Sequence, residues 1–206
     1  MSFEDISVKE FMDRLASDEP APGGGSASAI AGAMGSCLMG MVSNLTIGRE
    51  KFREYEEHMK TALDNSTRLR EELIQAADRD AEAFNRVIAA MKLPKGTEEE
   101  KRIRTQMLQE ALKGAALKPF DVALLCIEVL KLAWDLHDKG NPNALSDVGV
   151  GAHLAYAGMQ GAIMNVEINL PMIKDPEFVD ELKEKVEKAK TEGNRVYRHI
   201  IANVKF

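Results

Sequence analysis

The sequence has 206 residues and a mass of 22.7 kDa, a length typical of one domain, so we expect a single domain spanning residues 1–206. Hydrophobic residues make up 45% of it and charged residues 29%, which excludes an intrinsically disordered chain. The net charge of −6 argues against general nucleic-acid binding, which needs a basic surface. Cys37 and Cys126 lie in apolar runs without C-x-x-C spacing, which excludes a disulfide scaffold and a cysteine-rich zinc site.

The composition favours helices. Only 5% of the residues are aromatic, and a core of Ala, Leu, Val, Ile and Met suits closely packed helices better than a β-sandwich. The N-terminal sequence has no basic region followed by an apolar stretch, so we expect no signal peptide and a cytoplasmic protein.

The first predicted helix spans about residues 7–17, because Ser7 and Glu10 form a capping box ahead of apolar residues at helical spacing. The next segment, residues 20–25, is too rich in Pro and Gly for regular structure. No charged residue occurs between Pro20 and Gly48, and residues 26–47 are predicted to form one buried helix.

This charge-free run is long enough to be considered as a membrane span. Six polar residues dilute it, however, and Gly and Ala outnumber Leu and Ile. The spacing of Gly32, Ser36 and Gly40 places small residues on one face, which lets a second helix approach closely. We therefore favour a buried core helix over a membrane span, and we expect no membrane partner.

Four more helices are predicted along the rest of the chain. A long amphipathic segment spans residues 50–91, and another begins at Thr97 and continues to about residue 139. Pro119 lies inside the second of these, where the helix either kinks or a new helix starts. A second small-residue helix spans residues 146–169, and Asp175 caps the last helix. The predicted fold class is all-α: a bundle of about six helices in which the two small-residue-rich helices are buried.

Gly23, Gly24, Gly25 and Ser26 lead directly into the first small-residue helix. Free backbone N–H groups and the positive end of the helix dipole meet there, which suits an anion or the polar edge of a ligand. The alternative is a tight turn that ends in an N-cap. The motif is not a phosphate loop, because no Lys follows it, and Ser28 stands where a dinucleotide-binding fingerprint needs glycine.

Asp80 is the strongest candidate for a proton-transferring group. Helical spacing places it on the buried side of its helix, whereas Arg79 and Glu82 point outward. A carboxyl group among apolar side chains has a raised pKa and can exchange protons near neutrality. For Asp78 we favour the alternative, a surface acid near Arg79 or Arg86.

Further polar residues bracket the second small-residue helix: Asn141, Ser146, Asp147, Asn165 and Asn169. Asn165 and Asn169 are four residues apart in an apolar run, so they share one face, and buried amides need partners or a ligand. Each taken alone is more often a satisfied structural group. Together with a Ser-Asp helix start and the glycine turn, they favour a site for a polar ligand.

The sequence contains no pattern typical of a metal site or of a nucleophilic Ser or Cys. His58, His137, His153 and His199 show no metal-ligand spacing, and no Ser or Cys stands in a nucleophile motif, so we expect no metal.

Several stretches resemble the formimidoyltetrahydrofolate cyclodeaminase / methenyltetrahydrofolate cyclohydrolase family, in matching order and spacing over nearly the whole chain. They are residues 22–26, 32–35, 41–48, 80–84, 93–97, 140–141, 146–150 and 165–170.

The resemblance implies an all-helical homodimer that acts on folate one-carbon units without a further cofactor, so that the tetrahydrofolate derivative is the substrate. It implies that Asp80 is the catalytic acid, and we keep Asp147 as a second catalytic candidate. The substrate-binding candidates from the matching stretches are Gly23, Gly24, Gly25, Ser26, Lys95, Asn141, Ser146, Asn165 and Asn169.

The resemblance leaves two reactions open. A cyclohydrolase adds water to 5,10-methenyltetrahydrofolate to give 10-formyltetrahydrofolate, and a cyclodeaminase closes 5-formimidoyltetrahydrofolate to the methenyl form with loss of ammonia. We expect a free-standing enzyme without a formiminotransferase domain, which favours the cyclohydrolase, as do residues 44–48 and 93–95. A non-enzymatic scaffold would not need Asp80, Asn165 and Asn169 in apolar runs.

Overall fold

The structure is a computed structural model that describes residues 2–205, and within them it contains six α-helices and no strand. The helices are α1 (Val8–Leu15), α2 (Gly24–Thr46), α3 (Glu56–Met91), α4 (Glu98–Leu136), α5 (Leu145–Asn169) and α6 (Pro176–Asn203). Short 3₁₀ helices span Phe3–Asp5, Glu50–Tyr55, Pro142–Ala144 and Leu170–Met172. The predicted all-α bundle of about six helices is confirmed.

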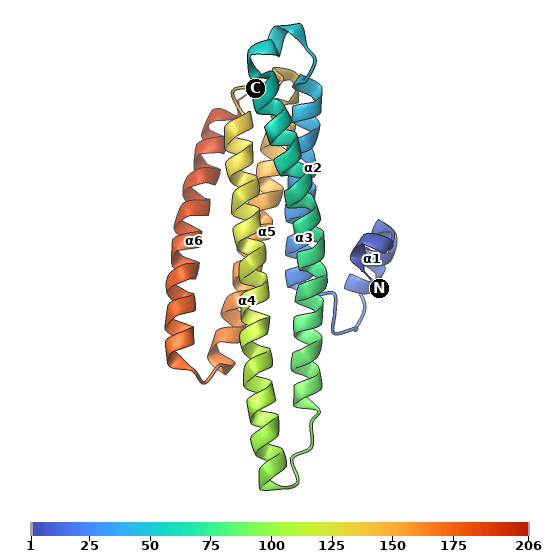
Figure 1. Cartoon of the computed structure of the whole chain (residues 1–206), viewed down its shortest axis with the longest axis vertical. Helices are drawn as coiled ribbons and strands as arrows, with labels where there is room; N and C mark the ends of the chain where they lie inside the picture. The colour runs from blue at the N-terminus through green and yellow to red at the C-terminus, as the bar shows by residue number, and fades with distance from the viewer. Residues whose placement is uncertain (1, 206) are drawn as a thin grey trace.

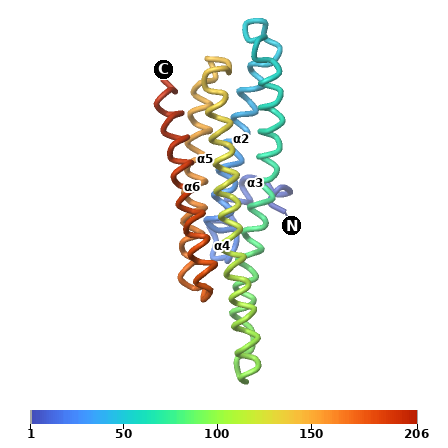
Figure 2. The backbone as a smooth tube through the Cα atoms, turned by 60° about the vertical axis from the view of Figure 1, so that its left-hand side comes forward, coloured from blue at the N-terminus to red at the C-terminus, as the bar shows by residue number. Residues whose placement is uncertain are grey.

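Helices α2 to α5 form the bundle, in which α2 contacts α3, α4 and α5. α6 lies along α4 and α5, and the short α1 stands to one side of α3 (Figure 1). α3 and α4 are longer than the others and project together beyond the end of the bundle, as both views show (Figure 2). The N-terminus of α2 therefore meets α3 partway along its length.

Two predicted helix boundaries need correction. α2 begins two residues earlier than expected, at Gly24, so that two glycines form its first turn. A 3₁₀ segment precedes α3, because the backbone of Phe52 is not helical. Of the two alternatives at Pro119, the start of a new helix is excluded, because α4 continues through Pro119 as one helix. Since Pro119 lacks an N–H group, the carbonyl of Ala115 loses its helical partner, and the Asn169 side chain of α5 donates a hydrogen bond to it at 3.1 Å.

Small residues let α2 lie very close to α5. A Cβ atom on Gly158 of α5 would come within 2.6 Å of the Ser28 carbonyl oxygen and 3.2 Å of the Gly32 nitrogen, both in the backbone of α2. A Cβ on Gly35 would lie 2.7 Å from the carbonyl oxygen of Gly151. The absence of side chains at these positions thus sets the spacing of the two helices.

α2 is the one helix among residues 2–205 that is long and apolar enough to cross a membrane by length and composition. Most of its apolar stretch is buried inside the bundle, as in the core helix of a globular fold. Its serines are accommodated by hydrogen bonds; Ser36 Oγ, for example, donates to the Ser66 carbonyl of α3 at 2.8 Å.

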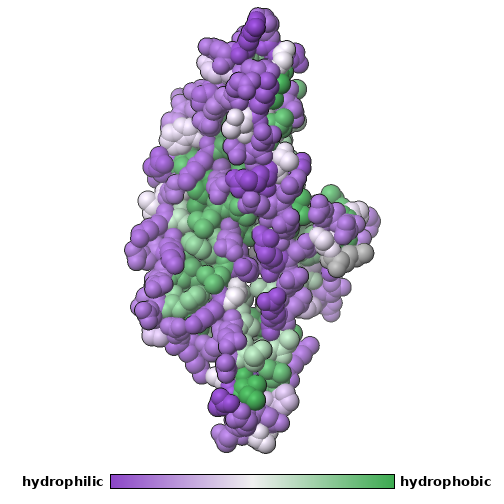
Figure 3. Space-filling view, viewed as in Figure 1, coloured by the Kyte–Doolittle hydropathy of each residue, from purple (hydrophilic) through white to green (hydrophobic). Residues whose placement is uncertain are grey.

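Figure 3 shows the face formed by α3, α4 and α6. Hydrophilic side chains line its edges, and a hydrophobic band runs along part of its middle. On α4, Leu117 and Leu124 remain 39% and 42% exposed. The charged sides of the long helices therefore face solvent, as their amphipathic sequences predict.

Replacing Gly158 by Ala should reduce the free energy of unfolding by about 2 kcal/mol, because α2 and α5 must separate to make room for the methyl group. Gly114→Ala in α4 is the control: its Cβ meets nothing within 4 Å, and alanine raises helix propensity, so stability should increase by about 0.5–1 kcal/mol. Urea denaturation at equal protein concentrations measures both. Equal stability of the two variants would show that the helices are not held this closely.

Candidate active site

A cavity of about 190 Å³ lies where the N-terminus of α2 meets α3, α4 and α5. Its lining combines the glycine turn, a carboxyl group and two asparagines with apolar side chains, one of them aromatic. The residues that line it are Pro20, Ala21, Gly23, Gly24, Gly25, Asp80, Ala81, Phe84, Ala115, Asn165 and Asn169. Six residues selected from the sequence thus meet in one cavity, although they come from three separate segments of the chain.

The α2 backbone lies directly against the carboxyl group of Asp80. A Cβ atom at Gly25 would overlap both carboxyl oxygens, so only glycine fits there. Ser26 Oγ lies 3.2 Å from Asp80 Oδ2 and 3.0 Å from the carbonyl oxygen of Ala77, and it can donate to either of them. Ser26, selected as a ligand contact, is fully buried and contacts Asp80 instead of the cavity.

Burial and hydrogen bonding act on Asp80 in opposite directions. Desolvation raises the pKa of the carboxyl group, because the charged form loses contact with water. Hydrogen bonds from the side chain and the backbone of Ser26 favour the charged form and lower the pKa. Burial is the larger effect, so the pKa of Asp80 lies above its ordinary value. This agrees with the prediction of a carboxyl group that exchanges protons closer to neutrality.

The start of α2 leaves backbone donors available. Gly23 is the N-cap residue and has no side chain to accept from the first-turn N–H groups. A Cβ at Gly23 would meet nothing within 4 Å, whereas one at Gly24 would lie 3.1 Å from Asn165 Nδ2. The turn therefore ends in an N-cap residue, Gly23, that leaves the first-turn N–H groups without a side-chain partner, and the helix N-terminus lines the cavity.

Asn165 and Asn169 form the opposite wall. Asn165 Nδ2 donates to the Gly161 carbonyl at 2.8 Å, and Asn169 Nδ2 donates to the Asn165 carbonyl at 2.7 Å and to Ala115. Across residues 2–205, no protein donor reaches the Oδ1 atom of either side chain. Both amides are thus oriented by the helices and keep an oxygen that can accept a hydrogen bond from a ligand.

The structure does not bring four other candidates to this cavity. Lys95 lies in the loop between α3 and α4, fifteen residues beyond Asp80, or about 22 Å away at the rise of a helix. Ser146 and Asp147 lie at the opposite end of α5 from Asn165, about 27 Å away. Asn141 ties this end of the bundle together: its N–H donates to Thr46 Oγ1 at 2.9 Å.

Two local expectations need correction. α5 begins at Leu145 with Ala144 as its N-cap residue, because a 3₁₀ turn leads into it, so Ser146 is not the cap. Asp78 does not pair with arginine; it accepts hydrogen bonds from Ser2 Oγ and, at 2.9 Å, from the Phe3 N–H, and thereby holds the N-terminal segment against α3.

Phe84 lines the cavity one helical turn after Asp80, although its position in an apolar pattern indicated a core residue. It is 40% exposed. Sequence spacing correctly places Phe84 on the same face as Asp80. It does not reveal that α2 begins beside Asp80 and leaves Phe84 uncovered.

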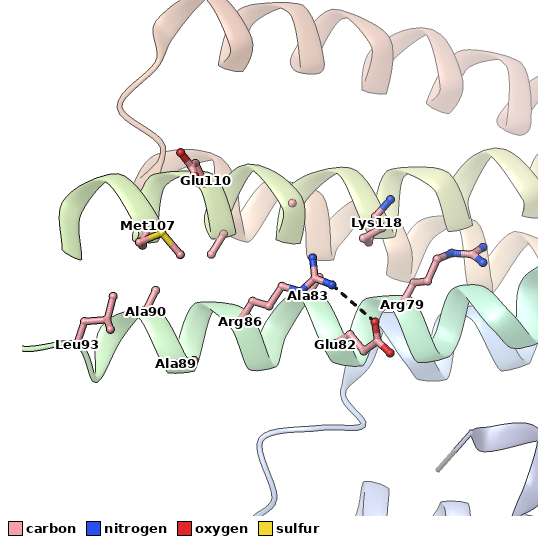
Figure 4. Close-up of a pocket in the computed structure, with 12 residues that line it drawn as sticks. Arg79, Glu82, Ala83, Arg86, Ala89, Ala90, Leu93, Met107, Glu110 and Lys118 are labelled. Atoms are coloured by element: carbon pink, nitrogen blue, oxygen red, sulfur yellow. Dashed lines mark ion pairs between the residues drawn. The ribbon is translucent and has the colours of Figure 1, made fainter. Parts of the chain in front are cut away.

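A larger cavity of about 550 Å³ lies between the projecting parts of α3 and α4. Figure 4 shows Arg86 reaching from α3 toward α4 across it, with Glu82 paired to Arg86 at 3.9 Å. Both of its carboxyl groups, Glu82 and Glu110, are exposed, and none of the candidates from the sequence lines it. The smaller cavity, which contains the partly buried Asp80 carboxyl group with its raised pKa, is therefore the candidate active site. Elsewhere in the described chain too, no group of three or more His, Cys, Asp or Glu could hold a metal ion.

Replacing Ser26 by Ala should raise the pKa of Asp80 further, because it removes a hydrogen bond that favours the charged form. Ser36→Ala is the matched control, since Ser36 is also a buried serine of α2 that donates to a carbonyl of α3 but lies away from Asp80. A ¹³C NMR titration of the side-chain carboxyl group measures both variants. An unchanged or lower pKa in Ser26→Ala would contradict the proposed contact.

Comparisons with known proteins agree with this arrangement. A family model described as formiminotransferase-cyclodeaminase matches residues 7–188. The chain is 42% identical over 199 residues to a methenyltetrahydrofolate cyclohydrolase of Methylorubrum extorquens, covering 97% of this chain and 96% of that protein. It is 33% identical over 196 residues to the formimidoyltransferase-cyclodeaminase of Rattus norvegicus, covering 93% of this chain but 36% of the rat protein.

A solved structure gives the same result in three dimensions. The crystal structure of a formiminotetrahydrofolate cyclodeaminase from Thermotoga maritima superposes with a TM-score of 0.88 at 32% identity, over 98% of this chain and 96% of that one. The extent of these matches shows that the chain belongs to the formiminotransferase-cyclodeaminase family.

Proposed function

We propose that the chain is a methenyltetrahydrofolate cyclohydrolase, which converts 5,10-methenyltetrahydrofolate and water into 10-formyltetrahydrofolate. The observation that carries the proposal is the partly buried Asp80 carboxyl group with a raised pKa, in a cavity that also contains two asparagines and an aromatic side chain. The 42% identity to a cyclohydrolase over nearly the whole length of both proteins supports this reaction over its alternative.

The cavity suits a cationic ring substrate. The methenyl group carries a positive charge shared between N5 and N10, which the Asp80 carboxylate attracts strongly in a partly desolvated site. The free Oδ1 atoms of Asn165 and Asn169 can accept hydrogen bonds from the polar edge of the pterin ring. Backbone N–H groups at the start of α2 supply donors for its acceptor atoms.

Asp80 first acts as a general base. It removes a proton from water as the oxygen bonds to the methenyl carbon, which gives a neutral tetrahedral carbon and a protonated carboxyl group. In the second step Asp80 returns this proton to N5 as the N5–carbon bond breaks. The hydroxyl proton leaves as the formyl C=O forms, so the overall reaction releases one proton.

Ser26 can form a hydrogen bond with Asp80 whether the Asp80 carboxyl group is ionised or protonated. When Asp80 is ionised, the Ser26 hydroxyl can donate to it, and when Asp80 is protonated the hydroxyl can turn to the Ala77 carbonyl and accept from Asp80. Since both partners are already within reach, proton transfer requires only rotation of one hydroxyl group. This arrangement supports a carboxyl group that acts as base and then as acid.

The alternative reaction is supported by the names of the rat relative and of the Thermotoga maritima structure, both cyclodeaminases. One purified sample should be tested for loss of methenyltetrahydrofolate absorbance and for ammonia release from 5-formimidoyltetrahydrofolate. We expect hydrolysis of the methenyl compound. Ammonia release without hydrolysis would assign the chain to the cyclodeaminase reaction.

Asp80→Asn should lower kcat for hydrolysis by about 10²–10⁴-fold, the usual contribution of general acid–base catalysis. KM should rise by a smaller factor than kcat falls, because the amide keeps the size of the carboxyl group but loses the charge that attracts the methenyl cation. Glu82→Gln, an exposed carboxyl group two residues further along α3, is the control and should leave kcat unchanged. If Asp80→Asn keeps more than a third of the wild-type kcat, Asp80 is not the proton-transferring group.

We further propose that the chain is a homodimer that pairs through the outer face of α2 and α5. α2 has no charged residue, and exposed apolar side chains share one side of each helix: Met34, Met41 and Leu45 on α2, and Val150, Met164 and Ile168 on α5. With a 23-residue α2 and two adjacent helices, this face measures about 34 by 20 Å, or about 700 Å². A standard interface buries about 800 Å² per partner.

Met34→Glu should convert the dimer into a monomer at micromolar concentration, because two buried carboxylates would face each other across the interface. Met107→Glu is the matched control: both methionines are 48% exposed, but Met107 lies on α4, away from this face. Sedimentation velocity distinguishes the two. A wild-type monomer, or monomers in both variants, would refute this interface.

A further inference from the structure

Phe84 differs from the other phenylalanines. Among the six in residues 2–205 it alone is exposed, whereas Phe3 and Phe120 are buried and Phe11, Phe52 and Phe178 are partly buried. It is not part of the hydrophobic core, and within the described chain it contacts no other aromatic ring. Its ring therefore contributes little to the packing of α3.

The position of Phe84 relative to Asp80 is nevertheless well defined. Both lie on the same side of α3, four residues apart, which separates them by about one helical turn, or 5–6 Å. Both line the same cavity, and Phe84 is its only aromatic residue. The two asparagines come from α5 and the free N–H groups from the start of α2, so Phe84 supplies the aromatic surface on the wall that α3 forms.

The proposed substrate has a matching arrangement. Its reacting carbon is bonded to N10, and N10 is bonded to the aromatic ring of the p-aminobenzoyl group. Standard bond lengths place the centre of that ring about 4 Å from the reacting carbon. With the reacting carbon at Asp80, a ring at that distance comes within reach of a side chain one helical turn away. The pterin ring, which has many hydrogen-bonding atoms, then faces the polar wall.

We propose that Phe84 binds the p-aminobenzoyl ring of the substrate and thereby orients N10 and the reacting carbon toward Asp80. This proposal rests on the proposed folate function and extends it to the aromatic part of the substrate. Aromatic pairs prefer offset-stacked or edge-to-face geometry with centroids about 4.5–7 Å apart, a distance that the position of Phe84 allows. Binding of the p-aminobenzoyl ring at Phe84 thus places N10 on the side of the cavity away from Asn165 and Asn169.

Two fragments of the substrate allow binding at Phe84 and binding at the asparagines to be measured separately. N-(4-aminobenzoyl)-L-glutamate contains the aromatic ring without the pterin, and 6-methyltetrahydropterin contains the pterin without the aromatic ring. Their dissociation constants should be measured by NMR titration with wild-type protein and with Phe84→Ala, Phe84→Leu and Phe84→Tyr. Leu117→Ala, which truncates a side chain of similar exposure (39%) outside the cavity, is the control.

Phe84→Ala should weaken binding of the aminobenzoyl fragment about 10- to 50-fold, since it removes both apolar contact and ring pairing. Phe84→Leu, which keeps the apolar contact, should weaken it about 2- to 10-fold, and Phe84→Tyr should retain it. Binding of the pterin fragment should stay within about twofold in all variants. In turnover of methenyltetrahydrofolate, Phe84→Ala should raise KM about 10-fold and lower kcat less.

Equal losses for both fragments, or unchanged binding of the aminobenzoyl fragment by Phe84→Ala, would overturn the proposal. A shift in oligomeric state with unchanged fragment binding would do so too, because Phe84 would then belong to a subunit interface. If wild-type protein binds the aminobenzoyl fragment through Phe84 but turns over neither folate substrate, the proposed reaction fails while this inference stands. If the protein turns over methenyltetrahydrofolate and Phe84→Ala has no effect, only this inference fails.

Discussion

The close approach of the α2 backbone to α3 and α5 determines both how the helices pack and where Asp80 lies. At Gly25 a Cβ atom would overlap the Asp80 carboxyl group, and at Gly158 it would overlap the α2 backbone. Because hydrogen takes the place of side chains there, α2 can lie in contact with α3, α4 and α5 along its length. The same close approach brings the N-terminus of α2 against Asp80 and partly buries its carboxyl group. The small residues that let the helices pack therefore also raise the pKa of Asp80.

The behaviour of Asp80 follows from two opposing effects of that position. Burial disfavours its charged form, whereas the Ser26 hydroxyl and backbone favour it. A carboxyl group governed by burial alone would hold its proton too tightly to act as a base. One governed by hydrogen bonds alone would be too weak a base to take a proton from water. In the proposed reaction, the contact with Ser26 would let one residue serve both steps of the hydrolysis.

On the wall that carries Asn165 and Asn169, hydrogen bonds within the protein fix the orientation of the side chains. Pro119 interrupts the hydrogen bonding of α4 and leaves the Ala115 carbonyl free, and Asn169 of α5 fills that vacancy. This bond fixes the side chain of Asn169 beside Asn165 and links α4 to α5 at the cavity. The proline inside α4 therefore has a structural consequence at the cavity, because the carbonyl that it releases orients Asn169.

Local features of the chain determined the helices and part of the site. Ser7, Thr97 and Asp175 cap helices as their sequence context predicts, and the glycine-rich run before a helix and the helical position of Asp80 make these residues site candidates. These features depend on residues within one or two helical turns, which the sequence contains directly. Only the tertiary structure decided that Phe84 stays exposed and that Ser146 and Asp147 lie far from Asn165. Helical spacing defines which residues share a face, but the antiparallel packing and unequal lengths of the helices decide which faces are covered and which ends meet.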